Sequence, residues 1–431
     1  MQNELLNRLE KSQEAFLAWK ETDLPIRQSI LTNVAKLLND RKEKYAHLMT
    51  KEMHKPISQS IAEIEKCAMM CEYYANAQNI LEDKIVDLEK SKGLVRYEPM
   101  GVILGIMPWN YPFWQVLRFA IPTILAGNAV VLKHASICRE SGDEIQKLFS
   151  DAGLPIGVFT HFLIGHSEVE DLIKHPIVKA VSLTGSEVAG RKIAELAGAN
   201  LKKCVLELGG NDAFIVLKDA DISKAAKDGA QARLQNSGQT CVAAKRFIIE
   251  EPVFDSFIKA FTEAFKDFVP SDPFDPTTKL SMMAREDLAD ELENQYQRAI
   301  EEGAEVLVPL KRLDSQSFLP GLLLMNTGNK VSEEELFGPL GMVFKAKDSD
   351  DALAIANEIH YGLANAVYTS SKELQNYFSK RLESGSVAVN QIFRSDWRMP
   401  FGGRKNSGYG IEMSLYTLEE FTIKKGVVGL L

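Results

Sequence analysis

Hydrophobic positions follow a helical period from Leu5 to about Leu81. Apolar residues spaced three and four apart are typical of helices that bury one face. The period is interrupted near Pro25 and Pro56, and proline ends or begins a helix because it lacks an N–H group and clashes with the preceding turn. The pattern therefore predicts a helical N-terminal region with breaks at the two prolines.

From Val95 onward the pattern changes to short, β-branched runs separated by amphipathic stretches such as 141–153. This alternation is typical of βαβ units and predicts a mostly parallel sheet. The predicted strands are GVILGIM (101–107), NAVVLKH (128–134), VFTHFLI (158–164), KAVSLTG (179–185) and CVLEL (204–208).

A second set of alternating elements follows, with strands expected at 213–217 and 245–251 and helices at 221–235 and 253–268. The fold class is therefore α/β, with two α/β domains. The sequence contains neither a repeat of fixed period nor a low-complexity linker. The boundary near 208–211 rests on the positions of the motifs.

Two segments differ from the rest in pattern. Segment 84–99 has extended runs on both sides of a Lys-Gly turn, and the chain ends in the apolar stretch EFTIKKGVVGLL. Ordinary edge strands would give the same pattern, but an apolar terminus frays or aggregates unless it is paired. We predict that 82–99 and 416–431 form a small β element for oligomerisation.

Composition narrows the class of protein. The 431 residues are 45% hydrophobic and 25% charged, which is average for globular proteins and long enough for two or three domains. A formal charge of −9 disfavours nucleic-acid binding. No signal peptide or membrane-spanning run is evident. We expect a cytoplasmic protein without nucleic-acid or membrane partners.

The five cysteines are odd in number and form no CxxC pair. This argues against a disulfide framework and a structural zinc site. Cys67 and Cys71 have helical spacing, but no second pair of ligands accompanies them. We therefore expect reduced thiols and no metal.

The usual nucleotide-binding motifs are missing. The chain has no GxGxxG motif, and in GSEVAGRK Arg191 occupies the position of the P-loop lysine. LTGSEVAG (183–190) follows a predicted strand and opens a helix, so its free N–H groups and helix dipole could receive a pyrophosphate. A glycine that permits a tight turn would explain the stretch equally.

Three further residues could carry chemistry. Asn110, bracketed by prolines in PWNYP, could stabilise an oxyanion or occupy a plain turn. Glu207 lies in an apolar run, where a buried carboxylate is either a general base of raised pKa or half of a salt bridge. Cys241 follows small polar residues, which favours an accessible nucleophile, although a lone cysteine is commonly an inert core thiol.

The motifs taken together identify a family. PWNYP, GNAVVLKHAS, LTGSEVAG, LELGG, GQTC, EELFGP and PFGGRKNSGYG occur in this order over nearly the whole chain. The set resembles the aldehyde dehydrogenase superfamily. The resemblance implies a Rossmann-like dinucleotide-binding domain over 1–81 and 100–208 and a catalytic domain over 209–415. It also explains the missing GxGxxG, because the family binds its dinucleotide in an atypical way.

The resemblance implies roles for the three candidate residues. Cys241 would attack the aldehyde carbon, and Asn110 with the Cys241 N–H would stabilise the oxyanion of the thiohemiacetal. Hydride transfer to the nicotinamide would leave a thioester. Glu207 would then activate water to hydrolyse that thioester to the carboxylic acid.

The cofactor contacts are likewise implied by the resemblance. NAD-preferring members usually carry a glutamate three residues after the lysine that matches Lys133, and Ser136 stands there instead. Because Ser136, Lys133 and His134 could accept a 2′-phosphate that a carboxylate would repel, we expect NADP to be preferred over NAD. The implied cofactor-binding residues are Pro108, Trp109, Lys133, Ser136, Gly185, Ser186, Gly190, Leu208, Glu335 and Phe337.

Among members of the family, the chain is most similar to the short succinate-semialdehyde dehydrogenases. Arg118, with Tyr111 and Trp114, falls where such enzymes hold the far carboxylate of the substrate. Gln235 replaces a second arginine, and Arg398 could supply the missing charge. Ile411, where the family usually has arginine, has no functional interpretation.

We expect an NAD(P)-dependent aldehyde dehydrogenase, a homodimer or homotetramer, that oxidises a small semialdehyde such as succinate semialdehyde. Two alternatives remain at this stage. A CoA-acylating enzyme would keep the fold, but the hydrolytic role of Glu207 argues against it. A non-catalytic protein that reuses the scaffold is disfavoured because Cys241, Glu207 and Asn110 are all present.

Overall fold

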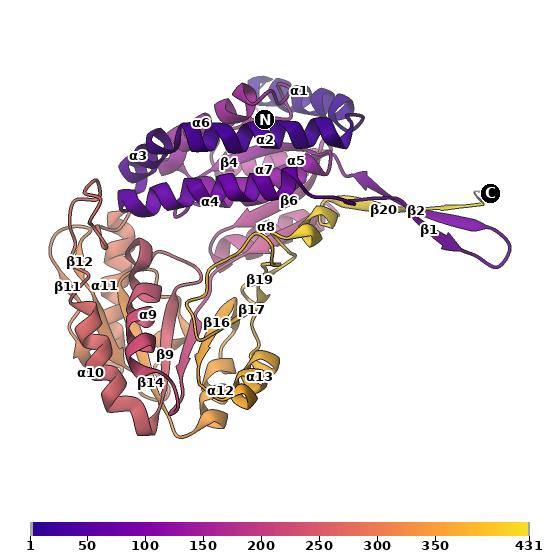
Figure 1. Ribbon diagram of the computed structural model, residues 1–431. Helices are drawn as coiled ribbons and strands as arrows, with labels where there is room; N and C mark the ends of the chain where they lie inside the picture. Colours follow the sequence, from indigo (N-terminus) through magenta and orange to yellow (C-terminus); the bar gives the residue numbers. More distant parts are fainter. Residues whose placement is uncertain (1–2, 430–431) are drawn as a thin grey trace.

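The structure is a computed structural model and describes residues 3–429. Two α/β lobes, each built on a large sheet, lie one above the other, and a narrow three-stranded sheet extends from the body (Figure 1). This arrangement confirms the predicted α/β class with parallel sheets.

The N-terminal region is helical, as the hydrophobic period predicts. Pro25 lies in the first turn of the second helix and Pro56 is the N-cap of the fourth, so both prolines stand where a missing N–H group costs nothing. The four helices are α1 (Asn3–Trp19), α2 (Leu24–Asp40), α3 (Lys42–Met53) and α4 (Ile57–Ala75).

The first large sheet has six strands in the order β19-β7-β6-β3-β4-β5, parallel except for β19. Its strands are β3 (Val102–Met107), β4 (Ala129–His134), β5 (Phe159–His161), β6 (Val178–Thr184), β7 (Lys203–Glu207) and β19 (Gly408–Tyr409). The helices between them are α5 (Pro112–Leu125), η1 (Ser136–Cys138), α6 (Arg139–Asp151), α7 (His166–Lys174) and α8 (Glu187–Ala199). Residues 408–409 fall in the range 209–415 expected for the second domain, but as strand β19 they pair with β7 of the first sheet. The chain crosses back to the first sheet there, which local patterns do not reveal.

The second large sheet has seven strands in the order β10-β13-β14-β9-β8-β16-β17, parallel except for β10. Its strands are β8 (Asp212–Val216), β9 (Ala244–Glu250), β10 (Glu305–Val308), β13 (Gly321–Leu324), β14 (Leu340–Ala346), β16 (Ala364–Tyr368) and β17 (Ser386–Val389). The helices of this lobe are α9 (Ile222–Leu234), η2 (Gln235–Gly238), η3 (Glu251–Val253), α10 (Phe254–Phe265), α11 (Glu286–Glu301), η4 (Lys330–Glu333), α12 (Ser349–Asn357) and α13 (Lys372–Arg381).

Side chains alternate between the two faces of each large sheet. On β8, Phe214 and Val216 pack in one core with α9 and α10, while Ala213 and Ile215 pack in another with α12. Strand β3 divides in the same way, with Ile103 facing the cluster of α2, α4 and α5 and Leu104 facing the other side. Both faces of each sheet are covered, as is usual for parallel sheets.

The projecting sheet consists of β1 (Lys84–Asp87), β2 (Lys92–Pro99) and β20 (Thr422–Val428), paired antiparallel in the order β1-β2-β20. It forms the arm in Figure 1, well away from the body. The expected Lys-Gly turn is wrong, because Lys92 and Gly93 belong to β2 and the chain turns at Leu88–Ser91. The apolar C-terminal stretch pairs with β2 of its own chain.

Three short elements complete the structure: the hairpin β11 (Lys311–Arg312) and β12 (Phe318–Leu319), the pair β15 (Tyr361–Gly362) and β18 (Arg404–Lys405), and the turn η5 (Leu415–Glu419). No helix within residues 3–429 has the length and apolar character needed to cross a bilayer. The cytoplasmic location remains a prediction of the sequence.

Candidate active site

A cavity of about 850 Å³ opens beside Cys241. Its wall is built from α4, α5 and α9, from the segment 240–243 and from the segment 392–397. Tyr111, Trp114 and Phe401 contribute aromatic surface to it. A concave, mainly apolar space with a few polar groups is the usual form of a small-molecule site.

Cys241 lies in the tight segment between η2 and β9 and is half-buried. Asn236, Ser237 and Gly238 just before it all have positive φ, at 55°, 55° and 75°. Two of these are not glycine, so the backbone is held in a conformation that side chains disfavour, and such strain clusters at functional sites. The bend directs Cys241 into the cavity wall.

A lysine that sequence reasoning missed supports this segment from behind. Lys245 is fully buried, and its Nζ donates to the carbonyl oxygens of Thr240 at 3.0 Å and Cys241 at 2.6 Å. The same Nζ lies 3.0 Å from Oε1 of Glu335. The lysine follows Cys241 in the sequence, but only the fold shows that its ammonium group turns back on the loop.

Burial raises the pKa of the Cys241 thiol to about 11. The positive charges of Arg118 and Lys245 lower the pKa, and the negative charges of Glu335 and Glu207 raise it. A pKa raised above its usual value keeps the proton on sulfur at neutral pH. Attack by the sulfur therefore needs a group that takes this proton.

Asn110 meets the Cys241 segment directly. It lies between β3 and α5 and is buried; its Nδ2 donates to the carbonyl of Gln239 at 3.0 Å, and its own carbonyl accepts from Nδ2 of Asn236 at 2.9 Å. The second N–H of the Asn110 amide and the Cys241 backbone N–H have no acceptor within residues 3–429. Two free donors of this kind beside a nucleophile suit a developing oxyanion.

Glu207 ends β7 and is 2% exposed. Neither of its carboxylate oxygens has a hydrogen-bond partner in the part of the chain that the structure describes. Burial, together with the negative charge of Glu412, raises its pKa well above the usual value, although Arg118 acts in the opposite direction. A carboxylate whose pKa is raised takes up a proton more readily, as a general base must.

The alternative interpretation of Glu207 as half of a salt bridge does not hold, because the nearby arginine, Arg118, pairs with Glu412. Arg118 and Glu412 are both about 3% exposed and form a close ion pair, and Arg118 also donates to the hydroxyl of Thr184 at 3.3 Å. The Arg118 guanidinium lines the cavity. Its charge is nevertheless already matched by Glu412.

Several predicted cofactor residues lie at the carboxyl ends of the parallel strands. Lys133 is half-buried at the end of β4, Ser136 is exposed in η1, and Ser186 caps α8 by accepting from the N–H of Ala189. Ligands of open α/β sheets bind at this edge. Lys133 has no acidic partner among residues 3–429, so these donors fit the phosphate of a dinucleotide.

Other predicted cofactor residues reach the same region from both lobes. Trp109 and Phe337 meet edge to face, with ring centroids 5.8 Å apart. Oε1 of Glu335 accepts from the N–H of Gly210 at 3.1 Å as well as from Lys245. Pro108, which precedes Trp109, and Gly185, which precedes Ser186, are half-buried. The structure thus brings segments near 109, 210 and 335 together, as one dinucleotide would require.

Two positions in this region have a structural role. A Cβ at Gly190 would lie 2.5 Å from a Leu208 methyl group, so the glycine lets α8 pack against Leu208. His134 is buried, its Nε2 lies 3.0 Å from the carbonyl of Pro112, and burial lowers its pKa to about 4. The suggestion that His134 could meet a 2′-phosphate is therefore wrong, because its neutral ring points into the protein.

Four of the five residues expected to bind substrate line the cavity, and one does not. Tyr111, Trp114, Arg118 and Gln235 line the cavity. Arg398 does not; it is exposed, and its guanidinium donates to both oxygens of Asp396, at 2.9 and 2.6 Å. Nothing in the structure explains Ile411.

Two cations that sequence reasoning missed line the cavity instead. Arg394 forms no hydrogen bond or ion pair with the described residues, and its charge acts on the Tyr111 hydroxyl. Lys66 donates to Oγ of Ser395 at 2.7 Å and lies 3.9 Å from the Trp114 ring centroid. Burial lowers the pKa of Lys66 to about 8. No pattern distinguishes Arg394 from Arg398 in the same stretch.

Comparisons with known proteins give a consistent picture. A model described as "Aldehyde dehydrogenase family" matches residues 2–427. The chain is 39% identical over 421 residues to the succinate-semialdehyde dehydrogenase [NADP(+)] of Deinococcus radiodurans, covering 97% of this chain and 88% of that one. It is 40% identical over 423 residues to the succinate semialdehyde dehydrogenase [NAD(P)+] Sad of Escherichia coli, covering 97% and 92%.

The fold agrees with solved structures. The crystal structure of succinic semialdehyde dehydrogenase from Streptococcus pyogenes, in complex with NADP+ as the cofactor, superposes with a TM-score of 0.96. The two chains are 34% identical, and the match covers 99% of this chain and 95% of that one.

Proposed function

The chain belongs to the aldehyde dehydrogenase family, and from this premise we propose that it oxidises succinate semialdehyde, or a similar small semialdehyde, to the carboxylic acid. The observation that carries the proposal is a half-buried thiol in the wall of a cavity that also contains unpaired cations. Relatives named succinate-semialdehyde dehydrogenases, similar over almost the whole chain, support this substrate class.

The proposed first step forms a bond between the Cys241 sulfur and the aldehyde carbon. The thiol proton leaves to a base, and the carbonyl oxygen gains a negative charge. Asn110 Nδ2–H and the Cys241 N–H donate to that oxygen. A nicotinamide dinucleotide held by the proposed cofactor residues, among them Lys133, Ser186 and Glu335, would accept the hydride of the aldehyde carbon. The acyl group then remains on Cys241 as a thioester.

The second step is hydrolysis. Glu207 takes a proton from water, the water oxygen attacks the thioester carbonyl, and the C–S bond breaks to release the acid and restore Cys241. The unpaired, buried carboxylate of Glu207 supports this role. Hydrolysis at this site disfavours the CoA-acylating alternative, in which a second thiol would accept the acyl group.

We expect reduction of NADP+ in the presence of succinate semialdehyde without added CoA. The measurement is the initial rate of absorbance at the reduced-nicotinamide band, with succinate semialdehyde and butanal as substrates and each cofactor in turn. A higher kcat/KM for succinate semialdehyde than for butanal is expected, because only the former carries a carboxylate. Absence of turnover with every aldehyde, or turnover that requires CoA, would refute the proposal.

NADP is the proposed preferred cofactor. Ser136 is exposed in η1, close in sequence to the half-buried cation of Lys133, and a hydroxyl at position 136 does not repel a 2′-phosphate. The two-cofactor assay tests this preference, and a higher kcat/KM with NAD+ than with NADP+ would contradict it.

The far carboxylate of the substrate is proposed to meet Arg394 and Lys66. Arg118 and Arg398 already have carboxylate partners, and Gln235 carries no charge. Lys227 also lines the cavity and has no ion pair among the described residues. Of these two cations, Arg394 is the one whose charge acts on Tyr111, which contacts the Cys241 segment. Because the Lys66 pKa is about 8, Arg394 is the more constant charge.

Arg394→Leu is expected to raise KM for succinate semialdehyde by about 10-fold to 100-fold, the value of one hydrogen bond to a charged group. The kcat/KM for butanal should stay the same, because butanal lacks the carboxylate. Arg398→Leu is the matched comparison, since Arg398 is bonded to Asp396 outside the cavity. A larger effect of Arg398→Leu, or an equal loss with butanal, would contradict the assignment.

The projecting sheet supports the proposal of a homodimer or homotetramer. Its side chains Ile85, Ile423 and Val428 are 70%, 49% and 76% exposed. Exposed apolar residues on edge strands favour pairing with another chain.

A further inference from the structure

A buried ion pair lies behind the proposed oxyanion donor. Lys55, in the segment between α3 and α4, forms a close ion pair with Glu63 of α4, and the two side chains are 0% and 1% exposed. Removing two charges from water is costly, and such a pair persists only where its geometry is well satisfied. Neither residue carries a role in the steps proposed above.

Glu63, which belongs to α4, caps the N-terminus of α5, the helix that follows Asn110. Its Oε1 accepts from the backbone N–H groups of Phe113 and Trp114, both at 2.9 Å. Helix α5 begins at Pro112, which has no N–H, and no side chain of its own N-cap residue caps it. The carboxylate from α4 therefore satisfies the first free N–H groups of α5 and faces the positive end of its dipole.

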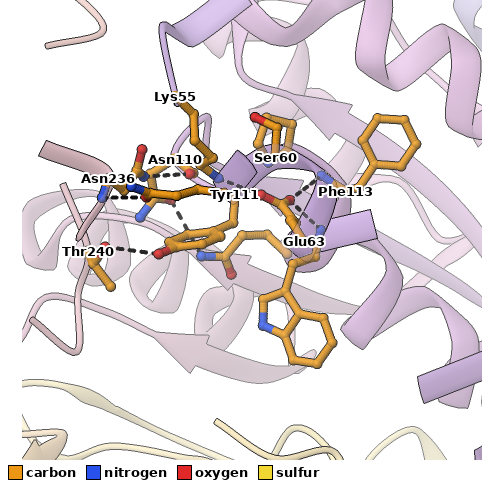
Figure 2. A network of polar contacts seen from close by, with 12 residues as sticks. Lys55, Ser60, Glu63, Asn110, Tyr111, Phe113, Asn236 and Thr240 are labelled. Carbon is orange, nitrogen blue, oxygen red and sulfur yellow. Dashed lines mark hydrogen bonds and ion pairs between the residues drawn. The ribbon is translucent and has the colours of Figure 1, made fainter. Parts of the chain in front are cut away.

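Lys55 also contacts the segment just before α5. Its Nζ lies 3.7 Å from the centroid of the Tyr111 ring, and the Tyr111 hydroxyl is 3.1 Å from Oγ1 of Thr240. Figure 2 shows Lys55, Tyr111 and Thr240 in succession across the network. A cation over an aromatic face, with the polar tip anchored, restrains the ring at both ends.

Asn110 lies between these two restraints and Cys241. Asn236 Nδ2 donates to its carbonyl, while the N–H of Asn236 donates to Oε1 of Gln59 on α4 at 2.8 Å. Helix α4 thus fixes the residues after Asn110 through Glu63 and the Cys241 segment through Gln59. A misplacement of about 1 Å in such a site is enough to cost a large factor in rate.

We infer that Lys55 and Glu63 are positioning residues: they hold the start of α5, and hence the Asn110 amide, in register with Cys241. The inference rests on the proposed function, because it needs Asn110 to act on the oxyanion. Lys55 itself is not proposed to contact the substrate or the dinucleotide.

The test is Lys55→Met with Glu63→Gln, which removes both charges and leaves neither one unpaired. We expect kcat to fall about 10-fold to 100-fold, with little change in KM for the aldehyde or in binding of NADPH measured by fluorescence titration. Lys42→Met with Glu65→Gln is the matched control, because this pair is likewise a lysine bonded to a glutamate of α4, but it lies at the start of α3 and is partly exposed. The control should leave kcat unchanged.

A double-mutant cycle separates positioning from general damage. In an Asn110→Ala background the paired substitution should cause no further loss of kcat, because the group that it positions is absent. An equal further loss in that background, or a lowered melting temperature with unchanged kcat, would overturn the inference. If Asn110→Ala itself leaves kcat unchanged, the proposed oxyanion role fails instead.

Glu63→Asp provides a second variant should the pair be needed for folding. It keeps the charge opposite Lys55 but shortens the side chain by one methylene, so it cannot reach Lys55 and both α5 amides as before. We expect the same pattern, a lower kcat that disappears in the Asn110→Ala background, with unfolding close to that of the unchanged protein. Full activity of Glu63→Asp would overturn the inference.

Discussion

Replacing Cys241 with alanine is expected to abolish aldehyde oxidation while dinucleotide binding stays intact. Alanine has no atom that can bond to the aldehyde carbon, so neither the thiohemiacetal nor the thioester forms. Cys241 is the one cysteine that is only half-buried; Cys67, Cys71, Cys138 and Cys204 are all buried. The measurements are the initial rate of NADP+ reduction and the Kd for NADPH.

Cys204→Ala provides the control, because Cys204 is buried on β7 and lies outside the cavity wall. It should retain oxidation. Residual oxidation by Cys241→Ala at a rate near that of the unchanged protein would mean that the nucleophile is misassigned. Loss of NADPH binding together with activity would indicate damage to the fold rather than removal of the nucleophile.

Asn110→Ala is expected to lower kcat by about 10²–10³, the usual cost of one oxyanion donor, with KM little changed. The amide is worth most after the sulfur has attacked, when the oxygen carries a charge, and it contributes little to binding of the neutral aldehyde. Initial rates over a range of succinate semialdehyde concentrations separate the two parameters. A change confined to KM would count against the oxyanion role.

Asn110→Asp refines this result. It preserves the shape of the side chain and its oxygen, but replaces the N–H donors by a negative charge beside the developing oxyanion. A fall in kcat at least as large as that of Asn110→Ala is expected. Activity near that of the unchanged protein would show that the side chain at position 110 supports the turn and does not donate to the substrate.

The charged groups around Arg118 argue against its expected role of binding the far carboxylate of the substrate. Its guanidinium is paired with Glu412, and its charge lowers the pKa of Glu207. It also lowers the pKa of the Cys241 thiol. One buried cation thus offsets charges at three titratable groups, which supports a role in balancing the site more than one in binding a distant carboxylate.

The local order of apolar and polar residues predicted the N-terminal helices and the strands that follow them, but not the return of β19 to the first sheet. The helical period broke at Pro25 and Pro56 where helices begin, and the β-branched runs became the strands β3, β4, β6, β7, β8 and β9. Both signals depend on neighbours a few residues apart, which occupy fixed positions along a helix or strand. The sequence also singled out Asn110, Glu207 and Cys241 as candidates, and the resemblance to the aldehyde dehydrogenase superfamily implied their roles.

Which charged residues pair with one another could be seen only in the tertiary structure. The sequence does not show that Arg118 pairs with Glu412, that Arg398 pairs with Asp396 while Arg394 lines the cavity, or that Glu63, paired with Lys55, caps α5. It also misplaced His134, whose ring turns inward. The chain's own order of apolar and polar residues determined which elements form; their packing decided which charges meet, because ion pairs act over a few ångströms between segments that the sequence keeps far apart.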